Sequence, residues 1–545
     1  VDHLIGVKLS QKYRFSEGST FQRRALQFDP NHVPARIQLA EDLLRLGQEE
    51  PGWTLANQVA DADPYNVKAY NLSTLHDSMS KFKTLEADGF VLRMNELEAA
   101  VYGDQALVLL KQARSELCEK YGLQLDSPVT VELFANPQDF AVRTFGIPDV
   151  DGYLGVCFGS VITANSPKAQ RPANWQAVLW HEFCHVVTLH LTRNKMPRWL
   201  SEGISVYEES QRNPTWGQRM NPRYRRMILT GELTPIGKLS GAFLNPPTPR
   251  HLQFAYYESS LVVEFLIGRF GLQSIRAILA DLGDGAEINT ALSKHAAPLA
   301  QLEEQFEAFA RKRAEAMAPQ ADWDEPSEEQ VNPADPQAVA DWLAGHPNSF
   351  WALRLQAQML LKSEQWEQAK KPLERLISLY PAYAEEDNAY QLLAAVHRKL
   401  DETEQERDVL GKLARMSSDA ADAYLRLMEI ATEQQAWEQV VENGDRYLAV
   451  YPLLSNAYWW IGRAAEELGR SERAVESYRR LLLLDPADPV EVHYRLGRLL
   501  RHEDPDAARR HVLEALADAP RFRDGHRLLL EIVNDSEGEN QGGAQ

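Results

Sequence analysis

The sequence predicts a mostly helical chain of the α+β class, in which a domain with a small mixed sheet lies between two arrays of helical repeats. Three observations predict this arrangement. Prolines recur at one regular interval near both ends of the chain. Between them, residues 90–164 contain short alternating or glycine-punctuated segments that are typical of strands. The apolar segment 178–187 carries two histidines four positions apart, which is helical spacing.

Residues 1–75 are expected to form helix pairs. The interval from Pro30 to Pro64 equals the period of the tetratricopeptide (TPR) repeat, a pair of antiparallel helices that recurs about every 34 residues. Apolar residues at helical spacing precede each proline: Leu4, Leu9, Phe21, Ala25 and Leu26 precede the first, and Leu39, Leu43, Leu55, Ala56 and Val59 precede the second. We therefore predict N-terminal TPR repeats at residues 1–75.

Residues 80–318 do not follow this repeat and are predicted to form one separate domain. Strands are expected at residues 90–94 and 129–134 and within residues 152–164, where the sequence alternates or is punctuated by glycine. Residues 98–121 have apolar side chains at the spacing of a long amphipathic helix.

The segment WHEFCH at residues 180–185 is the centre of this domain. On a helix, His181 and His185 lie on one face and can both reach one metal ion. The flanking residues are apolar, so the helix is expected to be buried, and a metal explains a buried pair of imidazoles. Glu182 lies beside them, where it can take a proton from a zinc-activated water.

Zinc hydrolases usually have three protein ligands, and Glu202 is the candidate for the third. Pro197 suits the first turn of a second helix, and Gly203 would let that helix pack closely against the first. Glu208 would be rotated about 120° from Glu202, and Glu209 would lie about 10 Å further along the axis. Glu202 is therefore preferred.

The motif HEFCH followed by WLSEG at residues 199–203 resembles the gluzincin metallopeptidases. The second segment is similar to the WLNEG segment of the aminopeptidase N family, in which the glutamate is the third zinc ligand. The whole pattern resembles the peptidase MA-like domains that are often joined to TPR repeats. This resemblance implies an upper lobe of strands followed by the two motif helices, and then an all-helical lower lobe.

The same resemblance extends to a tyrosine. Residues 255–266 are similar to the YEKG segment of the aminopeptidase N family, whose tyrosine donates a hydrogen bond to the oxyanion, and that match assigns the role to Tyr257. The alternative is that Tyr257 or Tyr256 only packs in the core.

Gluzincins also use an edge strand to pair with an extended substrate, and residues 153–159 stand at the corresponding place. The alternative for this segment is an ordinary central strand. We find no GxMEN segment, which holds the free amino group of the substrate in aminopeptidases. Its absence favours an endopeptidase over an aminopeptidase.

An acidic, proline-rich linker is predicted at residues 319–338, because this stretch contains too few apolar residues to bury. The repeat then returns. Successive prolines are separated by one, two, one and one repeat periods, at Pro347, Pro381, Pro452, Pro486 and Pro520. A C-terminal TPR solenoid is therefore expected at residues 339–533, followed by a disordered tail at 534–545.

Composition narrows the class of partner. The net charge is −20, which disfavours nucleic acid or an anionic membrane surface as a partner. No run of eighteen apolar residues occurs, so no integral membrane segment is expected. The three cysteines form no disulfide framework. We expect a soluble protein and favour the bacterial cell envelope or periplasm.

The sequence therefore predicts a peptidase that holds one Zn²⁺ through His181, His185 and Glu202 and hydrolyses peptide bonds with Glu182 and Tyr257. The TPR grooves are expected to bind a protein or peptide partner. Two alternatives are a catalytically inactive TPR scaffold and a zinc hydrolase that acts on a non-peptide amide. The presence of Glu182 favours an enzyme over a scaffold.

Overall fold

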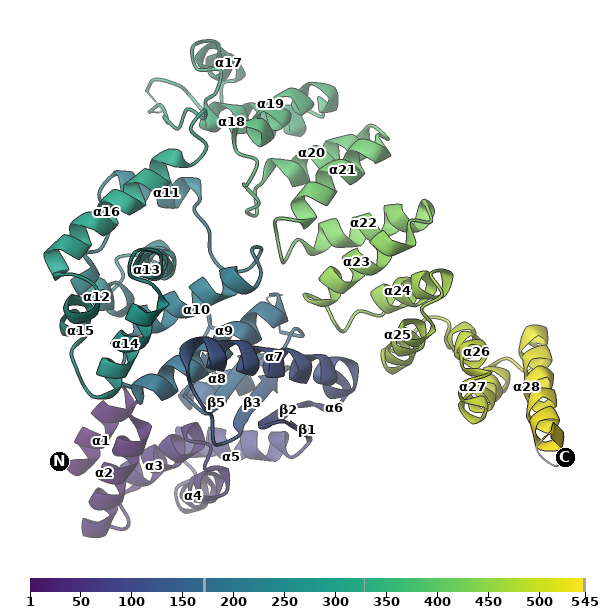
Figure 1. Ribbon diagram of the computed structural model, residues 1–545, viewed down its shortest axis with the longest axis horizontal. Helices are drawn as coiled ribbons and strands as arrows, with labels where there is room; N and C mark the ends of the chain where they lie inside the picture. Colours follow the sequence, from purple (N-terminus) through teal and green to yellow (C-terminus); the bar gives the residue numbers. More distant parts are fainter. Residues whose placement is uncertain (170–172, 328, 543–545) are drawn as a thin grey trace. The chain divides into compact units, whose positions relative to one another are not determined.

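The computed structural model describes residues 1–169, 173–327 and 329–542, and it is mostly helical (Figure 1). Contacts divide the chain into two compact units. The first comprises residues 1–99 and 103–418, and the second comprises residues 100–102 and the chain from Asp419 onwards. The division falls at Ser418, within the C-terminal repeats, whereas the sequence placed it in the linker at 319–338.

Five helices begin the first unit. They are α1 (Asp2–Ser10), α2 (Phe15–Phe28), α3 (Val33–Arg45), α4 (Glu49–Ala62) and α5 (Val67–Met79). Within this set, α1 packs against α2 and α3 packs against α4. His32 caps α3 and Asn66 caps α5, each by accepting a backbone hydrogen bond. Their apolar faces form one buried cluster around Trp53, and that cluster also contains Phe134 and Val161 of the sheet.

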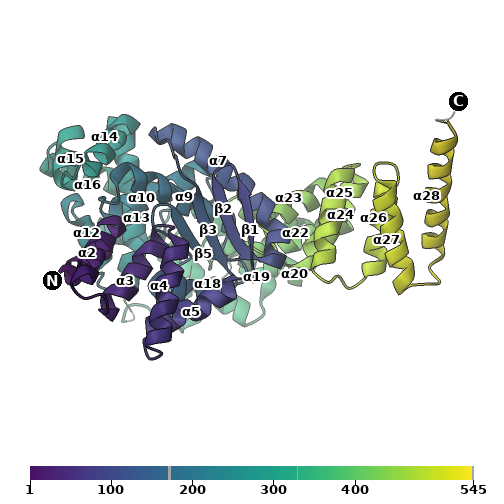
Figure 2. The same ribbon diagram turned by 90° about the horizontal axis from the view of Figure 1, so that it is seen from below.

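The sheet is mixed and has five strands in the order β1-β2-β3-β5-β4. They are β1 (Phe82–Ala87), β2 (Phe90–Asn95), β3 (Val129–Phe134), β4 (Gly155–Cys157) and β5 (Val161–Asn165). The strands β2, β3 and β5 are parallel, while β1 and β4 pair antiparallel at the two edges. Figure 2 shows β1, β2, β3 and β5 side by side. Strand β1 has no counterpart in the sequence prediction.

Helices cover both faces of the sheet. On one face α8 (Pro137–Phe145) carries Arg143, which forms a fully buried ion pair of 2.8 Å with Glu132 of β3. On the other face, Phe183 of α9 (Trp175–Thr192) packs on Phe90 of β2, and α7 (Asp104–Tyr121) packs beside α9. The expected long helix begins as α6 (Glu96–Glu98) and a π-helical turn over 99–103.

The remainder of the domain is helical, as the resemblance implied. Its helices are α10 (Arg198–Arg212), α11 (Pro222–Leu229), α12 (Leu239–Leu244), α13 (Pro249–Phe270), α14 (Leu272–Gly283), α15 (Ile288–His295) and α16 (Leu299–Ala316). A 3-10 turn precedes α12 at residues 236–238.

The acidic segment after α16 is more closely packed than the sequence predicts. The Trp323 ring lies 4.9 Å from the Phe350 ring, and Val331 is buried. The backbone of Asp322 exchanges hydrogen bonds with Asn348 and Phe350. The partly buried Trp323 side chain and the buried Val331 side chain anchor a stretch whose composition is otherwise that of a linker.

Helix pairs follow this segment. In the first unit they are α17 (Pro336–Gly345), α18 (Phe350–Lys362), α19 (Trp366–Leu379), α20 (Ala389–Lys399) and α21 (Thr403–Ala414). In the second unit they are α22 (Ala421–Glu433), α23 (Trp437–Leu448), α24 (Ser455–Glu467), α25 (Ser471–Leu483), α26 (Pro489–Leu500), α27 (Pro505–Asp518) and α28 (Arg523–Gly542).

Small residues stand where the repeat helices cross. A Cβ atom added at Gly462 of α24 would lie 2.6 Å from the Tyr478 ring of α25. At the end of the chain, α28 runs to Gly542, so most of the predicted disordered tail is helical, and residues 543–545 lie outside the described part. No proline interrupts this last helix, and Arg501 pairs with Asp535 on it. Within the described residues, no helix has both the length and the apolar character that crossing a membrane requires.

One buried carboxyl group ties a loop to α13. The Glu258 side chain is almost fully buried, and its Oε1 atom accepts a hydrogen bond of 2.6 Å from the Thr234 backbone N–H. Its Oε2 atom has no hydrogen-bond partner among the described residues. Burial raises the pKa of Glu258 to about 8, although the contact with Thr234 opposes the shift.

We predict that this carboxyl makes the first unit less stable as the pH rises. The pKa of Glu258 is higher in the folded chain than in the unfolded chain, so the protonated carboxyl stabilises the folded state fully below about pH 4.5. This contribution to the free energy of unfolding is lost as the pH rises to about 8, at up to about 1.4 kcal/mol per pH unit. Urea unfolding between pH 5 and 9 should show this slope in the wild type and not in Glu258→Gln. Glu264→Gln, on the same helix, should keep the slope; an unchanged slope in Glu258→Gln would contradict the assignment.

Candidate metal centre

Helix α9 carries three of the predicted site residues on one stretch. It begins after Asn174, whose side chain accepts hydrogen bonds from the N–H groups of Gln176 and Ala177. Most of its apolar residues are buried, including Cys184, which is a free cysteine in the packing of the core. The helix therefore holds His181, Glu182 and His185 in a largely dry environment.

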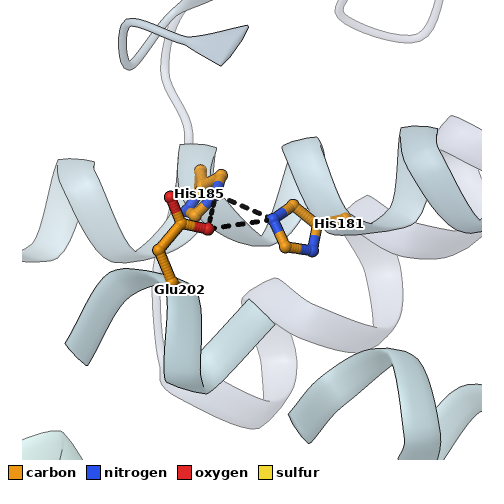
Figure 3. A group of neighbouring side chains, drawn as sticks. All are labelled: His181, His185 and Glu202. Atoms are coloured by element: carbon orange, nitrogen blue, oxygen red, sulfur yellow. Dashed lines mark hydrogen bonds and ion pairs between the residues drawn. The ribbon is translucent and has the colours of Figure 1, made fainter. Parts of the chain in front are cut away.

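Three ligand atoms converge beside this helix (Figure 3). The Nε2 atoms of His181 and His185 are 3.1 Å apart, and the Glu202 Oε2 atom is 3.3 Å from each of them. Ligands about 2.0–2.2 Å from a tetrahedral zinc ion are separated by roughly 3.4 Å, so this triangle has the size that one such ion requires. Among the described residues, this is the one group of three or more His, Cys, Asp or Glu residues with ligand atoms this close.

Side chains behind the histidines set the orientation of both rings. The Nδ1 atom of His185 lies 2.8 Å from Ser201 Oγ and 3.2 Å from Ser205 Oγ. The Nδ1 atom of His181 contacts the Glu209 carboxylate. With each Nδ1 atom engaged in this way, the two Nε2 atoms are directed at the hollow where a metal would bind.

Glu208 and Glu209, the two alternatives to Glu202 as third ligand, lie outside the ligand triangle. Glu209 lies behind His181 and does not enter the ligand triangle. Glu208 is buried elsewhere, where its two oxygens bind the Tyr121 hydroxyl and the Lys120 ammonium, both at 2.6 Å. The sequence shows that Glu209 follows Glu202 by nearly two helical turns. It does not show that Glu209 contacts His181, because that contact depends on how α9 and α10 cross.

The charges of the cluster favour a cation. Burial alone would raise the pKa of Glu202, but His185 and His181 hold it well below its usual range. Burial likewise opposes protonation of His181, yet the Glu209 and Glu202 carboxylates hold the pKa of the ring well above its usual range. The Glu209 and Glu202 carboxylates thus stabilise positive charge at His181, and a bound metal ion would supply that charge.

Glu182 lies against the edge strand β4. A Cβ atom added at Gly155 would lie 2.6 Å from Glu182 Oε1, so only glycine leaves room for this carboxylate. Burial raises the pKa of Glu182, and the two histidines oppose that rise in part. Its Oε2 atom is buried without a hydrogen-bond partner among the described residues. This is a polar atom to which a water or substrate could bind.

The position of Glu202 depends on a contact that the sequence analysis assigned to the wrong helix. A Cβ atom added at Gly203 would lie 2.6 Å from the Ser259 carbonyl oxygen, so the close approach of α10 is to α13 and not to α9. Pro197 precedes the helix as its N-cap and does not stand in its first turn. Arg198 steadies the glutamate, with its Nε 3.3 Å from Glu202 Oε1.

Tyr257 does not face this hollow. Its side chain is buried, its ring stacks on Tyr224 at 4.9 Å, and its hydroxyl is directed at Met220 Sδ, 3.7 Å away. The assignment from the sequence therefore needs correction, and the packing alternative describes Tyr257 as the structure has it. Consecutive residues on a helix point about 100° apart, so a match displaced by one residue selects the wrong side chain.

The neighbouring residue, Tyr256, is connected to the cluster through Arg198. Its hydroxyl accepts a hydrogen bond of 2.9 Å from Arg198 Nη2, and Arg198 also contacts Glu202. Burial and the nearby Glu202 charge raise the pKa of Tyr256. The sequence analysis named Tyr256 only as a packing residue, and nothing in the sequence singled out Arg198.

The N-terminal helices bring a further tyrosine to this region. Tyr13 lies in the turn between α1 and α2 with a positive φ of 62°, its carbonyl accepts a hydrogen bond of 2.8 Å from Asn194, and its ring packs beside Phe158. Although Tyr13 is 38% exposed, desolvation by the protein around it raises its pKa to about 12, with Glu202 and Glu182 adding to the rise and Arg198 opposing it. No pattern in the sequence connected residue 13 with this site.

Comparison with known families is consistent with the two parts of the chain. A family model described as the Peptidase MA superfamily matches residues 110–311, which include His181, His185 and Glu202. Tetratricopeptide repeat models match residues 351–383 and 455–488. The chain therefore contains a Peptidase MA superfamily domain followed by TPR repeats, as the sequence predicted.

Individual relatives share only parts of the chain. A probable biofilm formation methyltransferase of Pseudomonas putida, WspC, is 34% identical over 86 residues, or 16% of this chain and 20% of that protein. The chain thus spans about a fifth of the length of this curated relative. Among solved structures, MamA is 23% identical with a TM-score of 0.23 over 27% of this chain and 84% of its own. YrrB, described as a TPR protein with an unusual peptide-binding site, is 14% identical with a TM-score of 0.28 over 35% of this chain and 98% of its own.

We predict that the purified chain takes up about one equivalent of zinc and that His185→Ala loses this site. Removing the partner behind His181 in Glu209→Gln should weaken zinc affinity by about 10- to 100-fold. Competition with a chromophoric chelator measures both effects. Glu208→Gln changes the adjacent carboxylate, which does not contact the hollow, and should retain wild-type affinity. Zinc binding that is insensitive to His185→Ala would place the metal elsewhere.

Proposed function

We propose that the Peptidase MA superfamily domain at residues 110–311 is a zinc-dependent peptidase that hydrolyses peptide bonds, and that the TPR repeats bind a protein or peptide partner. The observation that supports this proposal best is the convergence of His181, His185 and Glu202 beside a buried Glu182 that has one unpartnered carboxylate oxygen among the described residues. A site that served only to stabilise the fold would need no such group.

His181, His185 and Glu202 are the proposed ligands. Two nitrogens and one oxygen form the donor set of catalytic zinc sites that keep a position for water. When bound, zinc would act as a Lewis acid that activates water and polarises the substrate carbonyl. The residues Ser201, Ser205 and Glu209 orient the ligands and do not themselves touch the metal.

Glu182 is the proposed general base and acid. Burial raises the pKa of this carboxyl, which brings it nearer to the pH at which a group can both accept and return a proton. In the proposed reaction, Glu182 takes a proton from the attacking water and then passes it to the leaving amine. Gly155 leaves the space in which the carboxylate can do this.

Tyr256 and Arg198 are the proposed stabilisers of the oxyanion. Their hydrogen bond and the contact of Arg198 with Glu202 place one phenol and one guanidinium donor beside the ligand triangle. Charge that develops on the carbonyl oxygen in the transition state is stabilised by donors of this kind, whose positions do not change during the reaction.

Strand β4 is the proposed platform for the substrate. It is an edge strand with a neighbour, β5, on only one side within the described sheet, and Glu182 lies against its first residue. An extended peptide can add to such an edge through backbone hydrogen bonds. The sequence contains no GxMEN segment of the kind that holds the substrate's free amino group in aminopeptidases, so cleavage within a chain is favoured over aminopeptidase activity.

We predict that Glu182→Gln retains zinc but loses hydrolysis of a peptide library by about 10²- to 10⁴-fold, because the shape is kept and the proton carrier is removed. Turnover of quenched fluorescent peptides measures the loss, and metal analysis checks the zinc. Glu307→Gln, on the exposed face of α16, is the matched control and should keep full activity. A wild-type chain that binds zinc but cleaves no peptide would instead support the inactive scaffold or a non-peptide amide as substrate.

We predict that Tyr256→Phe lowers kcat by about 10²-fold with little change in KM, because the lost donor acts mainly in the transition state. Tyr257→Phe removes only a hydroxyl that contacts Met220 and should leave kcat within about twofold. Steady-state kinetics of the two variants separates the assignments. A large loss of kcat in Tyr257→Phe alone would restore the assignment made from the sequence.

A further inference from the structure

A second site lies outside the metal centre, where α11 and the segment after α16 meet the first C-terminal repeat. A cavity of about 280 Å³ opens here, and its main lining residues are Arg225, Arg226, Trp323, Phe350, Trp351 and Arg354. All of these residues belong to the first compact unit. The cavity is large enough for one or two amino-acid side chains.

The aromatic wall of this cavity is held in place by the backbone. The Trp323 ring lies 4.9 Å from Phe350, and the neighbouring Asp322 bonds to Asn348 and Phe350 through main-chain hydrogen bonds. The Asp322 Oδ2 atom also lies 2.8 Å from His346 Nδ1. Trp323 is therefore fixed in a segment whose composition alone would leave it mobile.

The charge of the lining is opposite to that of the chain. Three arginines and one carboxylate, Glu325, line the cavity, although the net charge of the chain is −20. Arg226 pairs with Glu325 at 2.6 Å, and Arg354 pairs with Asp387. A concentration of guanidinium groups on an acidic protein attracts carboxylates to that place.

Arg225 is the arginine of this lining without an acidic partner. Its Nε donates to the Ala314 carbonyl at 3.2 Å, and its guanidinium lies 5.2 Å from the centre of the Trp323 ring. Among the described residues, no carboxylate forms an ion pair with it. Burial lowers the pKa of Arg225, and the charges of Glu315 and Asp324 oppose the shift without either carboxylate reaching ion-pair distance. A ligand carboxylate would fill that place with two parallel hydrogen bonds.

The cavity continues along α18 toward the next repeat. A second, smaller pocket shares Phe350, Arg354 and Gln358 with it and extends to Tyr380, Tyr383 and Tyr390. Arg354 thus lies where the two pockets meet. In the combined lining, Arg354 of α18 lies between the aromatic residues of the two pockets, and Arg225 and Arg226 come from α11. This spread of cationic and aromatic groups over two joined pockets suits a short extended peptide better than a single small anion.

We propose that this site binds a peptide segment in which a carboxylate side chain lies next to an aromatic one. The carboxylate pairs with Arg225 and Arg354, and the aromatic ring packs against Trp323 and Trp351. This inference specifies the peptide binding proposed above for the repeats and rests on that part of the proposed function. It does not depend on the proposed hydrolysis, because none of the residues involved contacts the metal centre.

The test uses the full chain with Glu182→Gln, so that no probe is cleaved, and a fluorescein-labelled peptide of sequence Gly-Glu-Phe-Glu-Gly. Fluorescence anisotropy should show saturable binding that weakens about tenfold or more when glutamine replaces both glutamates of the peptide. The Arg225→Gln and Arg354→Gln substitutions should each weaken binding of the acidic peptide about tenfold. Arg269→Gln, which removes an arginine of α13 outside this lining, should have no effect.

Removing the metal with a chelator should leave this binding unchanged, which separates a failure here from a failure of the proposed peptidase. Arg354 is part-exposed on a helix, so its variant is expected to fold even if Arg225→Gln does not. Equal affinity for the two peptides, or unchanged affinity in the Arg354→Gln variant, would overturn the proposal. Inorganic phosphate that binds as tightly as the peptide and displaces it would overturn the assignment to a peptide.

Discussion

Two imidazoles one helical turn apart and a carboxylate from a second helix are held within 3.3 Å of one another in a buried position, and the surrounding structure depends on this cluster. Buried charges and polar rings are costly unless each has a partner. Here the partners form a continuous set, because Glu209 lies behind His181 and two serines lie behind His185. The chain thus stabilises a charged arrangement that a cation would complete.

Two close approaches of the backbone make this cluster feasible. Gly203 lets α10 pack closely against α13, which fixes the position of the neighbouring Glu202. Gly155 lets the edge strand pack closely against Glu182. In both places a methyl group would clash with backbone or carboxylate atoms. The acid group, the ligands and the strand proposed to hold substrate are therefore positioned by packing between elements, and each depends on the absence of one side chain.

The repeats contribute to the first unit as more than an appended solenoid. The Tyr380 hydroxyl donates to the Met220 carbonyl at 2.8 Å, and Asn221 donates to Glu385 at 3.0 Å, so the segment that begins α11 is bonded to the repeats. Tyr224 of the same helix stacks on Tyr257 of α13. The site proposed for acidic peptides is lined by this helix, which links it physically to the Peptidase MA superfamily domain.

The sequence by itself determined the repeats, the order of strands before helices and the three residues, His181, His185 and Glu202, that converge in one cluster. These features depend on the periods of the TPR repeat, the strand and the helix, and on spacing within one helix. Tertiary structure alone decided which tyrosine faces the cluster, which helix Gly203 approaches, and the roles of Glu209, Arg198 and Tyr13. Each of these depends on how two elements distant in sequence cross, and a shift of one residue turns a helical side chain by about 100°. The same holds for Trp323, whose packing on Phe350 orders a segment that its composition marks as a linker.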